Sequence, residues 1–108
     1  EASIVESVGR GNTDVARRDL YFTVISESHK VMLLLQGDKL TPKRLYDTRN
    51  DPQELQNLVE DPNQAPIIGS LIGFLFRERA DLMAMRGVDI SAYANFSSSS
   101  DDLTQTVR

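Results

Sequence analysis

Few side chains in this sequence could take part in chemistry. The chain holds a single histidine, His29, and no cysteine, so thiol nucleophiles, disulfides and thiolate metal sites are excluded. A protonated His29 could hydrogen-bond an anionic oxygen. A lone histidine beside a short polar stretch is more often a solvated turn residue, and we therefore assign no catalytic residue.

Basic residues lie close to two of the predicted strands. Arg17 and Arg18 precede the first strand, and Lys43 and Arg44 belong to the third. These four residues could form a rim that faces an anion, while a solvated sheet edge protected by its charge explains them equally well. We keep His29, Lys43 and Arg44 as candidates for a substrate rim.

Two aspartates, Asp47 and Asp51, lie at and just after the third predicted strand. Their spacing lacks the alternating oxygen ligands of a calcium-binding loop, whereas aspartate is common in turns and at the N-cap of helices. The sequence therefore predicts turn and capping roles for both residues, and it predicts no metal site.

Composition limits the class of protein. The chain has 108 residues and a net charge of −4, which fits one domain with one core and argues against nucleic-acid binding, because phosphate contacts need an excess of Lys and Arg. Residues 1–50 hold eight basic and seven acidic groups, and residues 51–108 hold four and nine, so the first half is the better candidate to face an anion. No apolar run approaches the ~20 residues that cross a bilayer.

Hydrophobic periodicity predicts a small antiparallel sheet. Residues 1–18 show no sustained period and are interpreted as an irregular lead-in, part of which pairs with the sheet. Residues 20–25 alternate in a β-branched and aromatic run, and Val31–Leu35 form an unbroken apolar run typical of a strand covered on both faces. Pro42 is expected to stop any strand, so the third strand is placed at Lys43–Thr48.

Helical signals follow the strands. Asp51, Pro52 and Glu54 predict the capped start of a short helix that ends at Leu58. From Ile67 to Gly87 an apolar stripe near the 3.6-residue period predicts the main helix. The expected fold is therefore α+β, with an antiparallel sheet of three to four strands packed against one long C-terminal helix. The folded domain is placed at 19–88 and a flexible Ser- and Asp-containing tail at 89–108.

The stretch from Leu45 to Leu58 resembles a signature near the carboxyl end of the sulfatase family, within the alkaline-phosphatase-like superfamily. That signature runs Leu-Tyr-Asp-Leu, two variable residues, then Asp-Pro-x-Glu-x-x-Asn-Leu. The matching positions are Leu45, Tyr46, Asp47, Asp51, Pro52, Glu54, Asn57 and Leu58. Thr48 departs from the pattern. Upstream, Lys30 and the apolar residues after it resemble the family's Tyr-Lys-Leu-Ile strand, with His29 in the aromatic position and Ile25 where the family has Arg.

The resemblance implies a structural role for these residues. In the family, a Cys or Ser within Cys/Ser-x-Pro-x-Arg is oxidised to formylglycine, which acts beside a calcium-like divalent cation, and no such motif occurs in this chain. The chain would then be the non-catalytic C-terminal domain of a sulfuric ester hydrolase. Its partner would be the catalytic domain of the parent enzyme, which would hold both cofactors. The family is often extracytoplasmic, periplasmic or secreted.

A second interpretation stays open. The same scaffold could be a free-standing module that binds a protein or a polyanion through its basic strand edge, without hydrolase activity. The two interpretations differ in the surface they predict. A domain without its partner exposes an apolar face that favours self-association, whereas an independent module exposes no large apolar patch.

Overall fold

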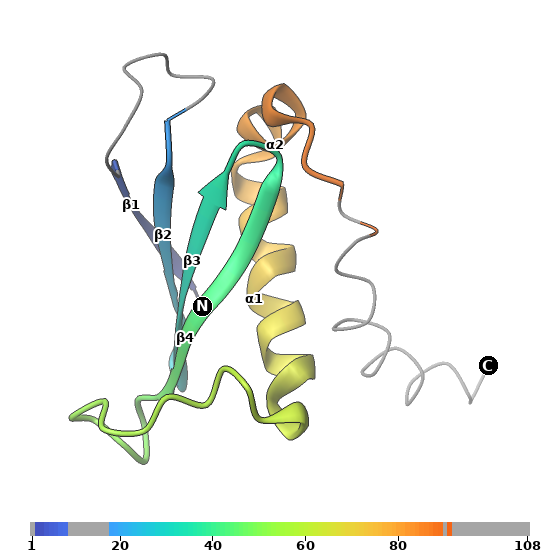
Figure 1. Ribbon diagram of the computed structural model, residues 1–108. Coiled ribbons are helices and arrows are strands. Elements are labelled where there is room, and N and C mark those ends of the chain that lie inside the picture. The colour runs from blue at the N-terminus through green and yellow to red at the C-terminus, as the bar shows by residue number, and fades with distance from the viewer. Residues whose placement is uncertain (1, 9–17, 90, 92–108) are drawn as a thin grey trace.

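The computed structural model describes residues 2–8, 18–89 and 91. Its strands, β1 (Ser3–Val8), β2 (Leu20–Ile25), β3 (His29–Gln36) and β4 (Lys39–Asp47), form one antiparallel sheet in sequence order. Helix α1 (Ala65–Glu78) lies along one face of this sheet, and α2 (Ala80–Arg86) continues from its end (Figure 1). The predicted α+β mix with a small antiparallel sheet is confirmed. The predicted tail lies outside the described residues, apart from Asp89 and Ser91.

The first strand lies in the segment 1–18, which the sequence predicts as an irregular lead-in that pairs in part with the sheet. Ser3–Val8 pair with all six residues of β2, so part of this segment does join the sheet. The sequence signal for β1 is weak, because Ser or Glu occupies three of its six positions. Ile4 packs against the core from this strand, and pairing with β2 supplies the remaining order.

The last strand passes through the proline that was expected to stop it. β4 begins at Lys39 rather than Lys43, and it includes Pro42 opposite Leu33. The register shifts beside this pair, between Met32 and Leu33. Edge strands and bulges tolerate a residue that has no N–H, and β4 is both an edge strand and irregular at this point.

Segment 51–58 is not a helix, although its capping residues predict one. Glu54 has a φ of 58°, in the left-handed region that a right-handed helix does not use. The Asp51 carboxylate accepts the backbone N–H groups of Leu55 and Gln56, each at 3.0 Å. A helix N-cap accepts from a residue two or three positions later, so Asp51 closes a wider loop instead.

The predicted single long helix is divided in two. Arg79 separates α1 from α2, with φ −124° and ψ 44°. Its guanidinium pairs with Glu6 of β1 and lies 5.7 Å from the centre of the Phe22 ring. The break coincides with a charged residue on the apolar stripe, and beyond it Met83 is again buried.

The ends of the helical layer follow the sequence signals. Asp61 caps a 3₁₀ turn, η1 (Pro62–Gln64), by accepting the N–H of Asn63 at 3.0 Å. Regular helix begins at Ala65, two residues before the predicted start, and Pro66 lies in its first turn, where a missing N–H is tolerated. Gly87 ends α2 in the left-handed conformation, with φ 70°, which is the usual helix-ending role of glycine.

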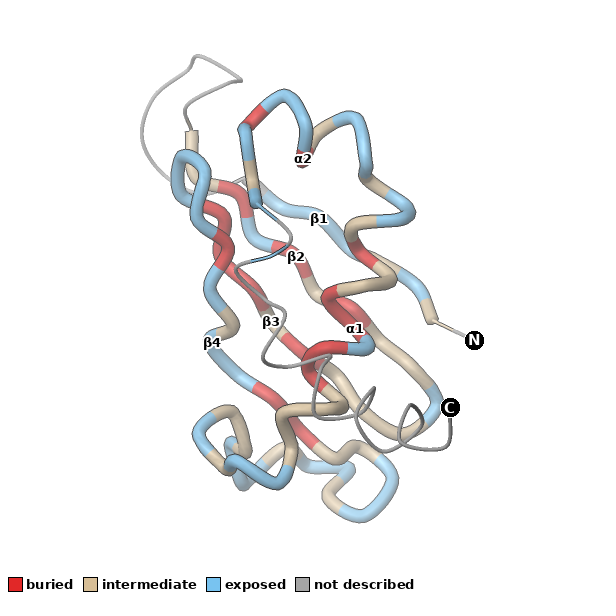
Figure 2. Tube along the Cα trace, turned by 90° about the vertical axis from the view of Figure 1, so that its right-hand side faces the viewer, coloured by how far each residue is buried: buried red, intermediate tan, exposed pale blue. Residues whose placement is uncertain are grey.

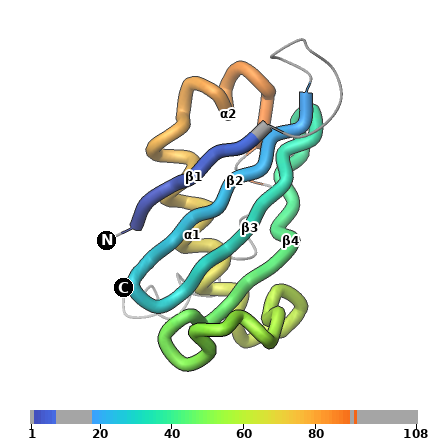
Figure 3. The backbone as a smooth tube through the Cα atoms, turned by 90° about the vertical axis from the view of Figure 1, so that its left-hand side faces the viewer, coloured from blue at the N-terminus to red at the C-terminus, as the bar shows by residue number. Residues whose placement is uncertain are grey.

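The core lies between α1 and one face of the sheet. Buried residues run along β2, β3 and α1 (Figure 2). The cluster comprises Leu20, Phe22, Val24, Val31, Leu33, Leu35, Leu40, Leu45, Ile68, Leu71, Ile72, Leu75 and Met83. Among the described elements, none covers the opposite face of the sheet, which Figure 3 shows from its open side.

Two glycines provide a matched test of the helical layer. Gly87 has a left-handed φ of 70°, which strains any residue with a Cβ. Gly73 lies inside α1, where an added Cβ would make an ordinary contact with Arg77 Nη1 at 3.6 Å. We expect Gly87→Ala to lower the free energy of unfolding by about 1–2 kcal/mol and Gly73→Ala to raise it by about 0.5–1 kcal/mol. Urea denaturation measures both, and effects of the same sign would contradict the assigned helix end.

Candidate functional site

The residues of the sulfatase-like signature form the corner between β4 and the helical layer. We call residues 45–58 the motif corner. It has no regular secondary structure after β4 ends at Asp47. Its polar side chains hold the backbone in place through hydrogen bonds.

Asp47 closes the first turn of the motif corner. Its Oδ2 accepts Nδ2 of Asn50 at 2.9 Å, and its Oδ1 accepts the Asn50 N–H at 3.1 Å. The Asp47 carbonyl accepts the N–H of Asp51 at 2.7 Å. The hydrogen bonds from the Asn50 side chain and then from its backbone lower the pKa of Asp47, and the nearby His29 acts in the same direction. Both carboxylate oxygens therefore serve the turn.

Asn57 ties the far end of the motif corner back to β4. Its Oδ1 accepts the backbone N–H groups of Leu45 and Val59, each at 3.0 Å, and its Nδ2 donates to the Lys43 carbonyl at 3.3 Å. The N–H of Leu58 donates to the Leu45 carbonyl at 2.7 Å. The Asn57 side chain therefore pairs with backbone groups on the edge of β4, as a neighbouring strand would.

An ion pair joins the motif corner to β3. Lys30 Nζ lies 2.6 Å from Glu54 Oε2, and both side chains are about a quarter to a third exposed. Glu54 reaches Lys30 from its left-handed backbone position, a conformation that usually persists only where the surroundings fix it. The pair connects the two parts of the chain in which the sulfatase resemblance was found.

The substrate-rim candidates do not gather at one place. His29 begins β3 opposite Asp47, and its Nδ1 lies 2.7 Å from Ser28 Oγ. Arg44 pairs with Met32, three positions further along β3, and alternation places it on the opposite face of the sheet from His29. Lys43, which has no partner in the β3–β4 register, is exposed like Arg44.

Two further basic residues were considered for the rim. Arg17 lies outside the described residues. Arg18 is half-buried, and its carbonyl accepts Nη2 of Arg86. Arg44 Nη1 donates to the Tyr46 hydroxyl at 3.2 Å, which raises the pKa of Arg44. Arg18 and Arg44 therefore take part in hydrogen bonds within the domain.

Arg86 is a structural residue that the sequence analysis missed. It is buried, with 6% of its surface exposed, and its Nη1 donates to the Gly37 carbonyl in the β3–β4 turn at 3.1 Å. It thereby fastens α2 to that turn. The available signal was its position three residues after Met83 on the apolar stripe, where a charge is unusual.

The structure offers no ready cation site in the part of the chain that it describes. Within residues 2–8, 18–89 and 91, no group of three or more His, Cys, Asp or Glu side chains is placed to hold a metal ion. The oxygens of Asp47 and Asp51 accept backbone and amide N–H groups instead.

None of the helices in the described residues is long and apolar enough to cross a membrane.

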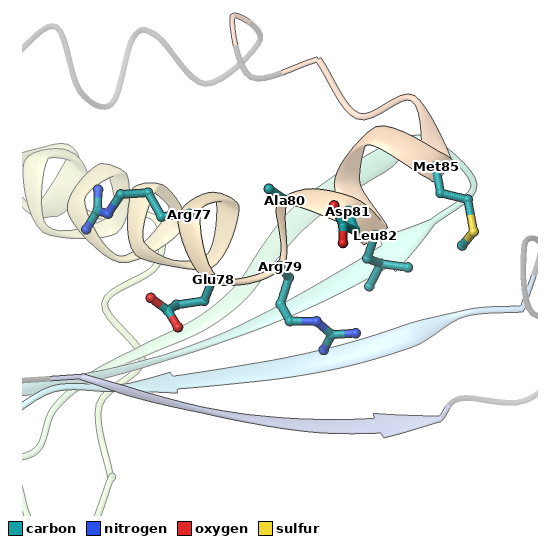
Figure 4. Close-up of a pocket in the computed structure, with 7 residues that line it drawn as sticks. All are labelled: Arg77, Glu78, Arg79, Ala80, Asp81, Leu82 and Met85. Atoms are coloured by element: carbon teal, nitrogen blue, oxygen red, sulfur yellow. The ribbon is translucent and has the colours of Figure 1, made fainter.

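An open hollow of about 600 Å³ lies where α1 meets α2. It is lined by Arg77, Glu78, Arg79, Ala80, Asp81, Leu82 and Met85. In Figure 4 the guanidinium of Arg79 is directed toward the sheet. A hollow of about 300 Å³ beside it runs along β1. The residues that line the two hollows include no histidine and no tyrosine, and Ser3 is the one serine among them.

The face of the sheet away from α1 carries a central group of apolar and aromatic residues with polar residues around it. We call it the outer face. Alternation along the strands places on it Val5, Tyr21, Thr23, Ile25, Met32, Leu34 and Tyr46, together with the polar residues Ser3, Ser7, Lys30, Gln36, Lys39, Thr41 and Arg44. Val5 and Tyr21 are 56% and 44% exposed, whereas Leu34 and Tyr46 are buried but belong to no cluster with the helix. The expectation that β3 is covered on both faces is therefore wrong for the described elements, since neighbouring side chains alone shield its outer face.

Comparisons with known proteins do not place the chain in a family. No protein-family model, no curated protein and no solved structure matches it. The resemblance of residues 45–58 to the sulfatase signature therefore stays a prediction, and the argument for function rests on the motif and its geometry.

The hydrogen bonds of Asn57 predict a graded loss of stability. Asn57→Ala removes three hydrogen bonds, and we expect it to lower the free energy of unfolding by about 1–3 kcal/mol. Asn57→Asp keeps the oxygen acceptor and loses only the donor to Lys43, so its loss should be smaller. Urea denaturation compares the two variants with the exposed control Asn63→Ala. An Asn57→Ala variant as stable as the control would contradict the role of this amide.

The lowered pKa of Asp47 predicts a defined pH dependence. The stabilisation by this carboxylate is complete above the ordinary carboxyl pKa of about 4 and is lost as pH falls through the lower folded value. Asn50→Ala removes the Nδ2 donor, which is the largest cause of the shift. We expect the NMR titration midpoint of Asp47 to move upward in this variant. An unchanged midpoint would show that the turn does not set the pKa.

Proposed function

We propose that this chain is the non-catalytic C-terminal domain of a sulfatase-type hydrolase. In this proposal it packs on the catalytic domain of its parent enzyme and contributes to the rim of the substrate pocket. The observation that carries the proposal is the motif corner, in which the residues shared with the sulfatase signature make mutually dependent contacts.

The contacts of the motif corner explain why its residue types occur together. Asp47, Asp51 and Asn57 each bind backbone groups at a different step of the same turn. Replacing any one of them leaves N–H groups without their acceptor, which is costly. A chance match over fourteen residues would not be expected to place these polar residues at the positions where the loop needs them.

The ion pair between Lys30 and Glu54 supplies a second, independent support. Lys30 belongs to the upstream segment of the resemblance and Glu54 to the signature itself, yet their charged atoms lie 2.6 Å apart. Two separate stretches that resemble one family thus meet in space. The four-stranded antiparallel sheet also agrees with the strands that the resemblance implies before the signature.

The proposal assigns the chemistry to another part of the parent enzyme. A divalent cation does not fit the motif corner, because the described residues there include no group of three or more His, Cys, Asp or Glu side chains placed to hold it. Formylglycine does not fit either, because the sequence has no cysteine and no Ser-x-Pro-x-Arg. Under this proposal the calcium-like cation and formylglycine belong to the catalytic domain, and the chain alone is inert. The parent would be extracytoplasmic, as the family often is.

The outer face is the surface best suited to the catalytic domain. Val5 and Tyr21 leave about half of their surface exposed, and Ile25 and Met32 are only partly buried. Contiguous apolar residues on the surface of a small domain are typical of an interaction site. Of the substrate-rim candidates, Arg44 would lie on this contact opposite Met32, while His29 at the end of β3 and Lys43 on the edge strand β4 would lie outside it.

The alternative is a free-standing module that binds a protein or polyanion. The exposed Lys39, Lys43 and Arg44 on β4 favour it, because an edge lined with cations attracts anionic partners. It predicts binding of a sulfated polysaccharide that weakens with salt and with the substitution of Lys43 and Arg44 by alanine.

The decisive test is the reading frame that precedes the codon for Glu1. We expect a Cys/Ser-x-Pro-x-Arg motif several hundred residues upstream, and hydrolysis of an aryl sulfate by the full-length parent but not by this chain. In the parent, Tyr21→Glu on the outer face should weaken the domain contact and lower activity, whereas Ser70→Glu, at an exposed position of α1 on the other side of the sheet, should not. A start codon directly before Glu1 would overturn the proposal.

A further inference from the structure

The two edges of the sheet are protected unequally. β4 carries Pro42, a register shift and the cations Lys39, Lys43 and Arg44, which are the usual means of preventing further strand pairing. β1 pairs with β2 without interruption and contains no proline and no lysine. No described residue pairs with its other side, so a row of backbone N–H and C=O groups stays open there.

The helical layer leaves space beside the β1 edge. The hollow of about 300 Å³ along β1 is bordered by Ile4 and Glu6 below and by Phe74 and Glu78 above. The neighbouring hollow of about 600 Å³ adds Leu82 and Met85, of which Met85 is 54% exposed (Figure 4). Side chains of an added strand that point toward the helical layer would enter these hollows and meet apolar atoms.

We propose that β1 of a second copy of this chain fills this place. The two β1 strands would run antiparallel about a two-fold axis perpendicular to the sheet, so that two four-stranded sheets become one of eight strands. A strand edge is self-complementary in this arrangement, because each copy offers the same donors and acceptors. This inference does not depend on the proposed function.

The side chains of β1 select one register. The two-fold axis keeps each face of the sheet continuous, so the axis passes through a residue opposite its own copy. With Glu6 opposite Glu6, two carboxylates would face each other, which is unfavourable. With Val5 opposite Val5, Ile4 faces Glu6 and Ser3 faces Ser7, and every residue of β1 from Ser3 to Ser7 has a partner. The second register pairs the strand without like charges and is the one we propose.

Charge and size also suit a second copy. Glu6 is already paired with Arg79 within its own chain, so each copy brings a neutral pair to the helix side of the joint. α1 lies against β2. In the eight-stranded sheet, β2 of one copy and β2 of the other are three strand spacings apart. The two α1 helices would therefore lie about 14 Å apart. That distance exceeds the 8–10 Å of packed helices, and Phe74 and Leu82 of both copies lie between them. The joint pairs only five residues of each β1 strand, so we expect weak, concentration-dependent dimerisation.

Cysteine cross-linking tests the proposed register directly. The natural sequence has no cysteine, and directly opposed strand residues have Cα atoms within disulfide range. Under mild oxidation Val5→Cys should give a covalent dimer of twice 12.1 kDa. Ser3→Cys and Thr41→Cys should stay monomeric, because Ser3 faces Ser7 and Thr41 lies on the other edge. All three residues are exposed, so the substitutions leave the core intact.

The outcomes separate edge pairing from other association. Cross-linking of Ser3→Cys as fast as Val5→Cys would indicate contact between outer faces and would overturn the proposal, as would cross-linking of Thr41→Cys at the same rate. Amide hydrogen exchange of the unmodified chain gives a second measurement. Edge pairing should slow exchange at alternate residues of β1 as protein concentration rises. A β1 exchange pattern that does not change with concentration would also overturn the proposal.

Discussion

The return of the chain from the sheet to the helical layer depends on side-chain hydrogen bonds more than on secondary structure. Between Asp47 and Ala65 the chain contains only the short turn η1 as regular structure. Connections of this length are uncommon in compact domains unless something fixes them. Asp47, Asp51 and Asn57 do so by accepting backbone N–H groups at successive steps. Because the core forms only if α1 arrives over β2, the burial of the apolar residues depends on this corner.

A single helical layer on a four-stranded sheet makes the molecule unequal on its two sides. One face gains the full burial of residues such as Phe22 and Leu33 beneath α1, while the outer face has only the shielding that neighbouring side chains give one another. Leu34 and Tyr46 are buried in that way without joining the core. A small domain has little surplus of buried area, so the exposed apolar residues of the outer face, such as Val5 and Tyr21, mark a place where more burial is gained by contact with another surface.

The sequence predicts the helices and strands whose hydrophobic pattern matches their burial in the fold. It does not predict those features that depend on where a strand lies in the sheet. Alternation in β2 and the apolar stripe of α1 were sufficient, because burial alone orders them. Pro42 was misjudged because its tolerance depends on β4 lying at an edge, which local sequence does not reveal. The prediction of a helix at 51–58 was wrong because the aspartate carboxylate accepts backbone N–H groups both at the start of helices and in loops, and the sequence does not distinguish the two. Arg79 interrupts the helical layer through its contacts with β1, a strand that the periodicity did not show.

The residues of the motif corner that resemble the sulfatase signature have structural roles in the loop, which are distinct from the chemistry of that family. A carboxylate that accepts one N–H group on each oxygen at about 3 Å is held in one orientation by the protein, and turning it toward a substrate would break these bonds. The loop would then lose the contacts that bring α1 back to the sheet. The residues that make this chain resemble a hydrolase are therefore the ones least free to act in hydrolysis. Under the proposed function the chain contributes to an enzyme through its surfaces, and the outer face and the open edge of β1 are the two that the fold leaves without a partner within the described residues.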